Sequence, residues 1–210
     1  WVNSVIIYDD MEMESVKKSF PNVKKLIIKK DVQNIHILNT LFPNVERVQS
    51  ESFMFESGPY LVRNRTLLNT FCKKESETMN LAWITSIVKK AFYKCNCLNV
   101  KNMDALSACE EAAFDDSALM AQPFKNGVKM AGNLVIAIDE TAEEVILPDE
   151  HTKVHLFAAD IDLSKIKKLV IHDIKSLEYV DNVPSYVVLD GNPRYDIEIE
   201  YLAHLSKGLS

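Results

Sequence analysis

The chain has 210 residues, of which 47% are apolar and 26% are charged, a composition typical of a folded protein rather than a disordered one. Its formal net charge of −6 argues against nucleic acid as a partner, because binding to phosphates requires a basic surface. Only five glycines are present, and neither a GxGxxG nor a GxxxxGKS/T motif occurs, which argues against a nucleotide-binding fold.

Apolar runs in the chain are short. The longest comparable one, residues 134–138, has the length of a strand, whereas a membrane-spanning helix needs roughly 18–20 residues. We therefore expect no membrane insertion by this segment. The chain begins at Trp1 and shows no signal peptide, so we expect it to be a piece of a longer protein.

An internal repeat begins near the N-terminus. Residues 20–26, Phe-Pro-Asn-Val-Lys-Lys-Leu, recur as residues 42–48, Phe-Pro-Asn-Val-Glu-Arg-Val, at an offset of 22. Such a period is typical of stacked solenoids, and leucine-rich repeats span about 20–29 residues. A single short strand cannot bury its apolar face, so successive coils must bury theirs jointly. We expect Phe20 and Phe42 to occupy equivalent places on successive coils.

The same period returns in the middle of the chain. Residues 84–92 are matched by residues 106–114 at an offset of 22, and each copy ends in Ala-Phe. Because their places in the repeat are equivalent, we expect Phe92 and Phe114 to stack in the core rather than to form an aromatic ligand platform.

The coarse pattern predicts short strands separated by turns. In chain order the predicted strands are 4–8, 25–29, 46–50, 98–103, 133–138, 168–172 and 186–189. Short helical turns are predicted at 32–41 and 106–114, and helix-like apolar spacing near the end predicts a C-terminal cap over 195–210. Residues 58–83 fit no repeat cleanly and are interpreted as an irregular segment within a single domain spanning 1–210.

One stretch resembles a known repeat family. Ile87-Val88-Lys89-Lys90-Ala91-Phe92-Tyr93-Lys94-Cys95, followed by Leu98, resembles the I-x-x-x-A-F-x-x-C-x-x-L unit of BspA-type leucine-rich repeats. Residues 143–149, Glu-Glu-Val-Ile-Leu-Pro-Asp, resemble the Ile-Pro step of that family. The second copy departs from the unit, with Ser117 where the cysteine belongs.

The resemblance implies both a fold and a kind of function. The fold is an α/β leucine-rich-repeat right-handed solenoid, strand-rich, with strands on the concave side and short helices and turns on the convex side. The function is a non-catalytic protein-binding module, extracellular or on the cell surface, serving adhesion or interaction with a host or partner protein. Members of the family are not enzymes, and no cofactor and no shared catalytic or ligand residue is implied.

The cysteines are the first candidates for chemistry. Cys72, Cys95, Cys97 and Cys109 lack the paired CxxC spacing of a structural zinc site and are too few for a disulfide scaffold. Cys95 and Cys109 fall at inward repeat positions, so we interpret them as small buried hydrophobes. The pattern does not decide whether Cys72 and Cys97 face inward or outward.

A histidine pair is the second candidate. His151 and His155 are four residues apart, which on a helix would place two imidazoles on one face, as a metal site requires. Pro148 and the repeat register instead predict a turn that enters a strand. We therefore predict no catalytic, cofactor-binding or metal-binding residue, and a cysteine- or metal-dependent enzyme is the least favoured alternative.

Binding residues are predicted from the strand period, because alternate residues of a strand face opposite sides. The outward candidates for contact with a partner protein are Ile6, Tyr8, Ile27, Lys29, Gln49, Glu51, Val170 and His172. Outward residues vary in chemistry while inward ones stay apolar apart from Ser50, as in a constant scaffold with a variable surface. The other open interpretation is a structural spacer that holds another domain and binds nothing itself.

Overall fold

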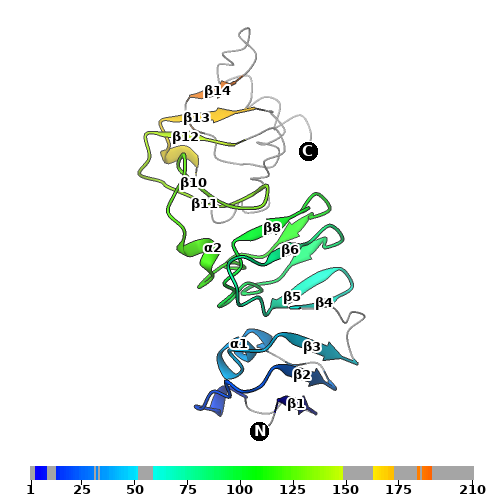
Figure 1. Ribbon diagram of the computed structural model, residues 1–210. Helices are drawn as coiled ribbons and strands as arrows, with labels where there is room; N and C mark the ends of the chain where they lie inside the picture. The colour runs from blue at the N-terminus through cyan, green and yellow to red at the C-terminus, as the bar shows by residue number, and fades with distance from the viewer. Residues whose placement is uncertain are drawn as a thin grey trace. The chain divides into compact units, whose positions relative to one another are not determined.

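The computed structural model describes residues 3–8, 13–30, 32, 34–51, 59–148, 163–172, 184 and 186–190. The described residues are strand-rich with few short helices, and their strands stack in a β-solenoid arrangement of about seven turns (Figure 1). It divides into two compact units, residues 1–121 and 122–210. The single domain over 1–210 stays a prediction, and the predicted cap at 195–210 lies outside the described residues.

Unit 1 holds most of the described strands. Its elements are β1 (Ser4–Ile7), η1 (Met13–Ser15), β2 (Lys25–Ile28), η2 (Ile35–Ile37), α1 (Leu38–Leu41), β3 (Arg47–Ser50), β4 (Tyr60–Arg63), β5 (Thr66–Thr70), β6 (Thr78–Asn80), β7 (Ser86–Ile87), β8 (Asn99–Lys101), β9 (Ala108–Cys109) and α2 (Ala118–Ala121). In unit 2 the elements are β10 (Val128–Ala131), β11 (Leu134–Ile138), β12 (Glu144–Ile146), η4 (Leu163–Lys165), β13 (Lys168–Ile171) and β14 (Val187–Leu189).

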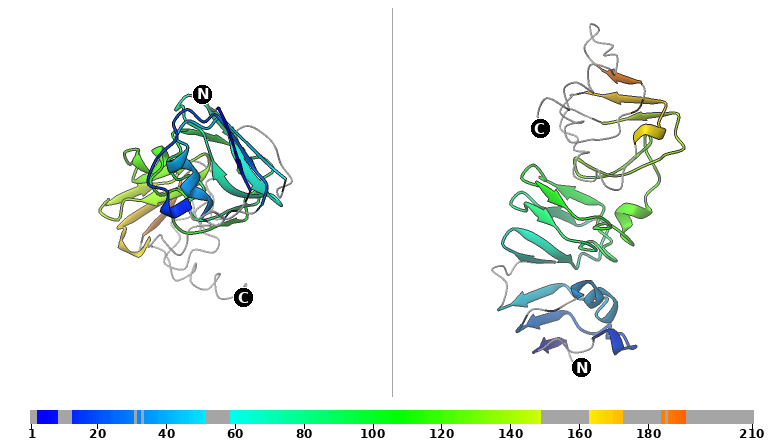
Figure 2. Two further views of the ribbon diagram at one scale, coloured as in Figure 1. Left: turned by 90° about the horizontal axis from the view of Figure 1, so that it is seen from below. Right: turned by 180° about the vertical axis from the view of Figure 1, so that it is seen from behind.

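The N-terminal coils form a parallel sheet in the order β1-β2-β3. Ile6 pairs with Ile27 on the next coil, and Ile27 pairs with Gln49 on the coil after that. The three strands overlie one another when viewed along the stack (Figure 2). Leu26 and Ile28 are fully buried, while Ile27 between them is partly exposed. The predicted strands at 4–8, 25–29 and 46–50 are confirmed, and η2 and α1 form the helical turn predicted at 32–41.

The repeated Phe-Pro-Asn segment forms the same turn in both coils. Val23 donates its amide to Phe20 O at 3.2 Å, and at the equivalent place on the next coil Val45 donates to Phe42 O at 3.2 Å. The Phe20 and Phe42 rings stack with their centroids 5.7 Å apart. These two phenylalanines therefore occupy equivalent places on successive coils, as predicted, although only the second is buried.

The middle coils repeat this geometry. β5, β7 and β9 pair in parallel, with Ser86 opposite Thr66 on one side and Ala108 on the other. The Phe92 and Phe114 rings are both buried and stack at 4.4 Å, which confirms the predicted core stack. β8 confirms the strand predicted at 98–103. The helical turn predicted at 106–114 is wrong, because the register with β7 makes residues 108–109 a strand that is followed by turns.

Residues 58–83 leave the parallel pattern at one place. β4 and β5 form an antiparallel hairpin whose turn residues, Asn64 and Arg65, both have left-handed φ values of 50° and 64°. Left-handed values at both central residues are typical of the type I′ turns that join two-residue hairpins. β5 and β6 then pair in parallel with β7 and β8, so this segment contributes strands to the stack.

A buried asparagine pair joins α1 to the middle coils. The Asn39 amide donates to Asn69 Oδ1 at 3.1 Å, to Thr70 O at 3.0 Å and to Tyr93 O. Asn69 in turn donates to Ile35 O at 3.0 Å and accepts from the Thr70 amide at 2.8 Å. Because both side chains are fully buried, these hydrogen bonds replace the water that the polar groups would otherwise need.

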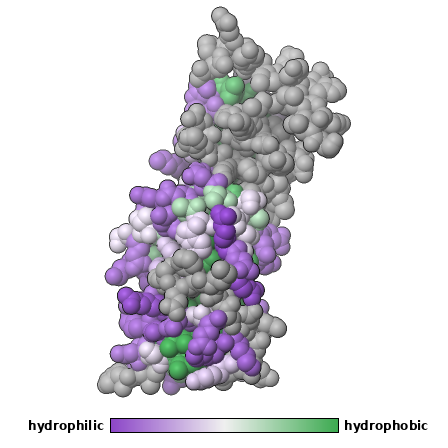
Figure 3. Space-filling view, turned by 90° about the vertical axis from the view of Figure 1, so that its right-hand side faces the viewer, coloured by the Kyte–Doolittle hydropathy of each residue, from purple (hydrophilic) through white to green (hydrophobic). Residues whose placement is uncertain are grey.

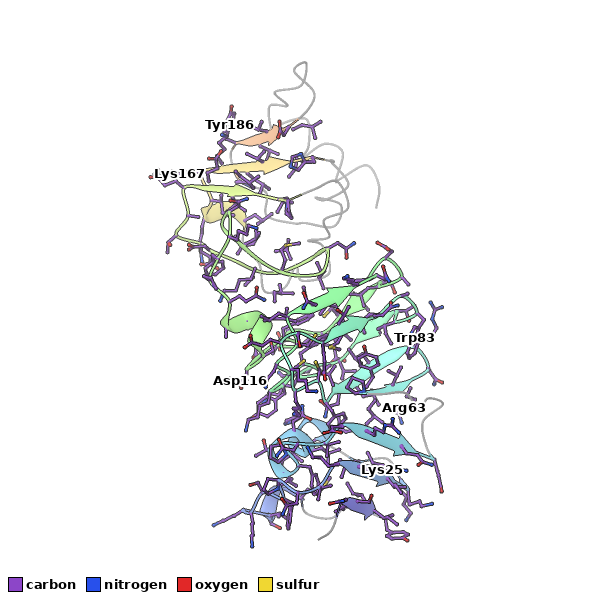
Figure 4. All side chains as sticks on the ribbon, in the orientation of Figure 1. Lys25, Arg63, Trp83, Asp116, Lys167 and Tyr186 are labelled. Carbon is purple, nitrogen blue, oxygen red and sulfur yellow. The ribbon has the colours of Figure 1, made fainter. Side chains whose placement is uncertain are left out.

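Unit 2 combines a hairpin with a second parallel stack. β10 and β11 are antiparallel, and β12, β13 and β14 pair in parallel. Lys167, labelled in Figure 4, reaches Glu143 across neighbouring coils at 2.6 Å. Gly127 has a φ of +77°, and a Cβ on it would lie 2.7 Å from Val145 Cγ2, so this position requires glycine. The predicted strands at 133–138, 168–172 and 186–189 are confirmed.

Truncation of the stacked rings tests the repeat register. Phe92→Ala and Phe114→Ala are each expected to lower the free energy of unfolding by about 3–5 kcal/mol, because each leaves a cavity in the core. Lys89→Ala, whose side chain is 54% exposed, should cost less than about 0.5 kcal/mol. Denaturant melts measure all three variants, and equal losses would contradict the register.

Removal of the Asn39 amide tests the contribution of the buried Asn39–Asn69 hydrogen bonds to stability. Asn39→Leu leaves buried acceptors without their donor and should cost about 3 kcal/mol. Asn44→Ala is the matched control, because the Asn44 amide makes an exposed hydrogen bond to Pro21 O, at 2.9 Å, and its loss should cost about 0.5 kcal/mol. Combining Asn39→Leu with Asn69→Leu should cost less than the sum of the two single losses, since the hydrogen bonds between the two side chains are lost only once. Equal melts for the Asn39 and Asn44 variants would refute a structural role for the pair.

Candidate functional site

The outward side of the β1-β2-β3 sheet brings six predicted residues together, and we call these six the outward strand face. They form two rows that cross the three coils. One row consists of Ile6, Ile27 and Gln49, and the other consists of Tyr8, Lys29 and Glu51. The sheet register continues into the second row, where the Lys29 amide donates to Ile7 O at 2.8 Å and the Glu51 amide donates to Ile28 O at 3.1 Å.

Exposure differs along these rows. Tyr8 is 64% exposed and Ile6 is 44% exposed, which are high values for large side chains with apolar surface. Ile27, Lys29 and Gln49 are partly exposed, and Glu51 is exposed. Figure 3 shows one face of the molecule, on which hydrophilic side chains predominate and a small hydrophobic patch lies near the N-terminal coils.

The second row carries paired charges. The Lys29 ammonium bridges to the Glu51 carboxylate on the neighbouring coil. The hydrogen bond to Glu51 raises the pKa of Lys29, and the nearby Tyr8 hydroxyl acts in the same direction. Since both side chains face solvent, the pair is screened and orders the surface more than it stabilises the fold.

The two predicted partner-binding residues in unit 2, Val170 and His172, differ in exposure. Val170 is 8% exposed and lies between two buried neighbours, Leu169 and Ile171, so its prediction as an outward residue is wrong. The physical reason is that β13 is buried on both sides, as continuous apolar strands often are. His172 is partly exposed, and its Nδ1 lies 3.8 Å from an Asp190 carboxylate oxygen.

Three cysteines converge inside unit 1. Cys72, Cys95 and Cys97 are free thiols and fully buried, and the Cys72 thiol is hydrogen-bonded to the other two. Cys72 also donates to a Glu77 carboxylate oxygen at 2.8 Å, and Cys97 donates to Glu77 O at 2.9 Å. Cys72 and Cys95 are separated by nearly one repeat period, and that signal could have revealed the cluster in the sequence.

The environment of Cys72 keeps its proton in place. Hydrogen bonds with Cys95 and Cys97, then burial, then the hydrogen bond to Glu77 all raise the pKa of the Cys72 thiol. A thiolate there would face a carboxylate without water to screen it. Because the thiolate is the reactive form of cysteine, Cys72 is poorly suited to nucleophilic chemistry.

The other repeat positions follow the predicted register. Cys109 pairs with residue 87 of the neighbouring strand but is only partly buried, so its interpretation as a small buried hydrophobe is wrong. Ser117 is buried one repeat after Cys95, and both amides donate to the carbonyl of the preceding repeat phenylalanine, Phe92 or Phe114. The Ser117 hydroxyl also accepts from the Met120 amide at 3.2 Å, so it caps α2.

Within the described ranges, no group of three or more His, Cys, Asp or Glu side chains is arranged to hold a metal ion. His151 and His155 lie outside the described residues. Among the helices that the structure describes, none has the length and apolar character needed to cross a membrane.

Comparison with known proteins gives no family assignment. No family model matches the chain, and no curated protein and no solved structure is significantly similar to it. The function must therefore be inferred from the surfaces of the molecule.

Alkylation tests the state of the thiols. We expect iodoacetamide at about pH 8 to modify Cys109 first and to modify Cys72, Cys95 and Cys97 at least about tenfold more slowly, because burial blocks access and only local opening exposes them. Mass spectrometry of peptides from the native chain measures the order, with unfolded chain as the control in which all four react. Rapid native labelling of Cys72 would contradict the described environment.

Proposed function

We propose that this chain is a non-catalytic protein-binding module of the BspA-type leucine-rich-repeat kind, acting at a cell surface in adhesion or in interaction with a partner protein. The observation that carries the proposal is the outward strand face in the first three coils. There, exposed apolar side chains stand in fixed rows on a rigid sheet, and their inward neighbours form the core.

The composition of this face is suited to a protein partner. Protein interfaces combine an apolar centre with a polar rim, and tyrosine is enriched in them. Ile6 and Ile27 supply adjacent apolar surface, Tyr8 adds an amphipathic ring, and the Lys29–Glu51 pair adds a polar border. Large exposed side chains of this kind often mark interaction sites.

Rigidity also favours the proposal. Each outward residue lies in a strand or directly after one and is adjacent to a buried residue, so little conformational entropy is lost when a partner binds. The stacked-coil architecture can also change its outward residues without disturbing the core, which suits a module whose specificity varies between relatives.

A combined substitution tests the surface. Tyr8→Ala, Lys29→Ala and Glu51→Ala in one chain should leave the melting temperature nearly unchanged and weaken binding to a partner at least about tenfold, because interface aromatics dominate binding energy. Lys17→Ala with Lys18→Ala is the control, since both lysines are exposed and lie between the strands. Its affinity should stay within about twofold of the unmodified chain.

The partner for this measurement is isolated from secreted and cell-surface proteins by affinity to the chain, and its affinity is then measured with the purified proteins. Unfolding of the triple variant would contradict the outward placement of these side chains. An unchanged affinity would place binding elsewhere on the chain. Failure of the chain to retain any partner would favour the structural spacer.

A further inference from the structure

Unit 1 contains a basic cavity that belongs neither to the outward strand face nor to the cysteine cluster. Its volume is about 440 Å³, and it lies between the segment that follows β2 and the turn that follows β7. Four of its lining residues are basic: His36, Arg63, Lys89 and Lys90. Among the described residues that line it, none is acidic, although the chain as a whole carries a formal charge of −6.

The basic side chains come from separate parts of the fold. His36 lies in η2, Arg63 ends β4 where Figure 4 labels it, and Lys89 and Lys90 follow β7. Residues far apart in the sequence thus converge on one cavity. A local run of lysines on a solvated surface would not produce this arrangement, which depends on stacking of the coils.

Two of the basic groups lie against one aromatic ring. The Tyr93 ring packs edge-on against the His36 imidazole with centroids 5.7 Å apart, and the Lys90 ammonium lies 5.8 Å from the same ring centroid. The backbone of Lys90 is fixed in a left-handed conformation with φ of 58°, and its amide donates to Ala112 O at 3.1 Å. Groups held before binding lose less entropy when a ligand arrives.

The charge of Lys89 is only weakly compensated by a neighbouring carboxylate. Its ammonium lies 3.5 Å from the Glu111 carboxylate, and both side chains are more than half exposed. Exposed pairs at that separation contribute little, so an incoming anion can compete for this ammonium. The Lys89 amide is already bonded to Glu110 Oε2 at 2.7 Å, which fixes the backbone of the turn.

The remaining wall is mostly apolar. Val32, Ile35, Leu68 and Val88 line the cavity, and all four are partly exposed. A fully hydrated inorganic anion would leave this apolar surface unused. Small-molecule sites combine such walls with a few convergent polar groups that fix orientation.

From this cavity, its four basic groups and its apolar wall, we propose that unit 1 binds a small amphiphilic organic anion, with an acidic head group near Arg63, Lys89 and Lys90 and an apolar body against the valine, isoleucine and leucine side chains. Arginine and lysine together suit carboxylate, sulfonate or phosphate oxygens. This site is independent of the proposed binding of a protein to the outward strand face.

A pair of dyes tests the proposal on the full chain. 1-Anilinonaphthalene-8-sulfonate carries an apolar body and an anionic head, and N-phenyl-1-naphthylamine carries the same body without the charge. We expect the anionic dye to bind with a stoichiometry of one and at least about fivefold more tightly than the neutral dye. Raising the salt concentration from about 20 mM to about 500 mM should weaken it at least about threefold, because salt screens the charges.

Charge-neutralising variants locate the site. Lys89→Gln with Lys90→Gln should weaken binding of the anionic dye about five- to twentyfold, and Arg63→Gln should weaken it several-fold from a separate element. The matched control is Lys17→Gln with Lys18→Gln, an adjacent exposed lysine pair outside the cavity, which should bind the dye as the unmodified chain does.

Three results would overturn the proposal: equal binding of the charged and neutral dyes, unchanged binding in the Lys89/Lys90 variant, or equal loss in the Lys17/Lys18 control. Circular dichroism melts of each variant accompany the titrations. If the Lys89/Lys90 variant does not fold, binding of the anionic dye to the Arg63→Gln variant tests the proposal instead. Unchanged binding to that variant would contradict it.

Discussion

Parallel pairing between successive coils is the constraint on which the described stacks depend. Neighbouring strands lie about 4.8 Å apart, and a shift of one position would turn every inward side chain outward. Each coil must therefore return to nearly the same place after a near-constant length of chain. The pairings of β1 with β2, of β2 with β3 and of β7 with β9 meet this requirement, since each joins positions that are one repeat apart.

That register explains why residues at equivalent repeat positions contact one another. The phenylalanine rings at 92 and 114 stack, and Lys24 reaches Glu46 on the neighbouring coil at 2.9 Å. Even unusual backbone conformations recur: Lys90 and Ala112 have φ values of 58° and 55°, although alanine disfavours the left-handed region. Each coil packs against the coil before it and the coil after it. A substitution of an inward residue therefore affects both of these contacts.

The separation of core and surface follows from the same geometry. Alternation along β2 and β3 places one set of side chains in the core and leaves the other free to vary. The connecting segments are less constrained, and they bring basic side chains together at one cavity and thiols together at another place. The outward strand face and the basic cavity therefore both depend on the buried core of the coils, although the core residues need not contact a ligand.

Sequence alone predicts seven of the fourteen described strands, those in which the period and the two-residue alternation act together, whereas β4 to β7, β9, β10 and β12 were not predicted. The helical turn at 106–114 was wrong because Ala-Cys-Glu-Glu-Ala has good helix formers, and pairing with β7 outweighs that weak preference. Val170 was misplaced because alternation does not hold in a strand buried on both sides. The basic cavity was missed because its members lie on different coils and only folding brings them together, whereas the thiol cluster was missed because the near-repeat separation of Cys72 and Cys95 was not used.

The Asn39 amide has a consequence for how unit 1 comes apart. A stack in which each coil touches only its neighbours can fray from an end, one coil at a time, as in a one-dimensional chain of units. Asn39 is bonded to Asn69, Thr70 and Tyr93, and the last of these lies 54 residues away along the chain, which is more than two repeat lengths. Opening the first coils therefore breaks bonds to the middle ones, and this long-range coupling makes unfolding of the unit more cooperative than simple stacking would.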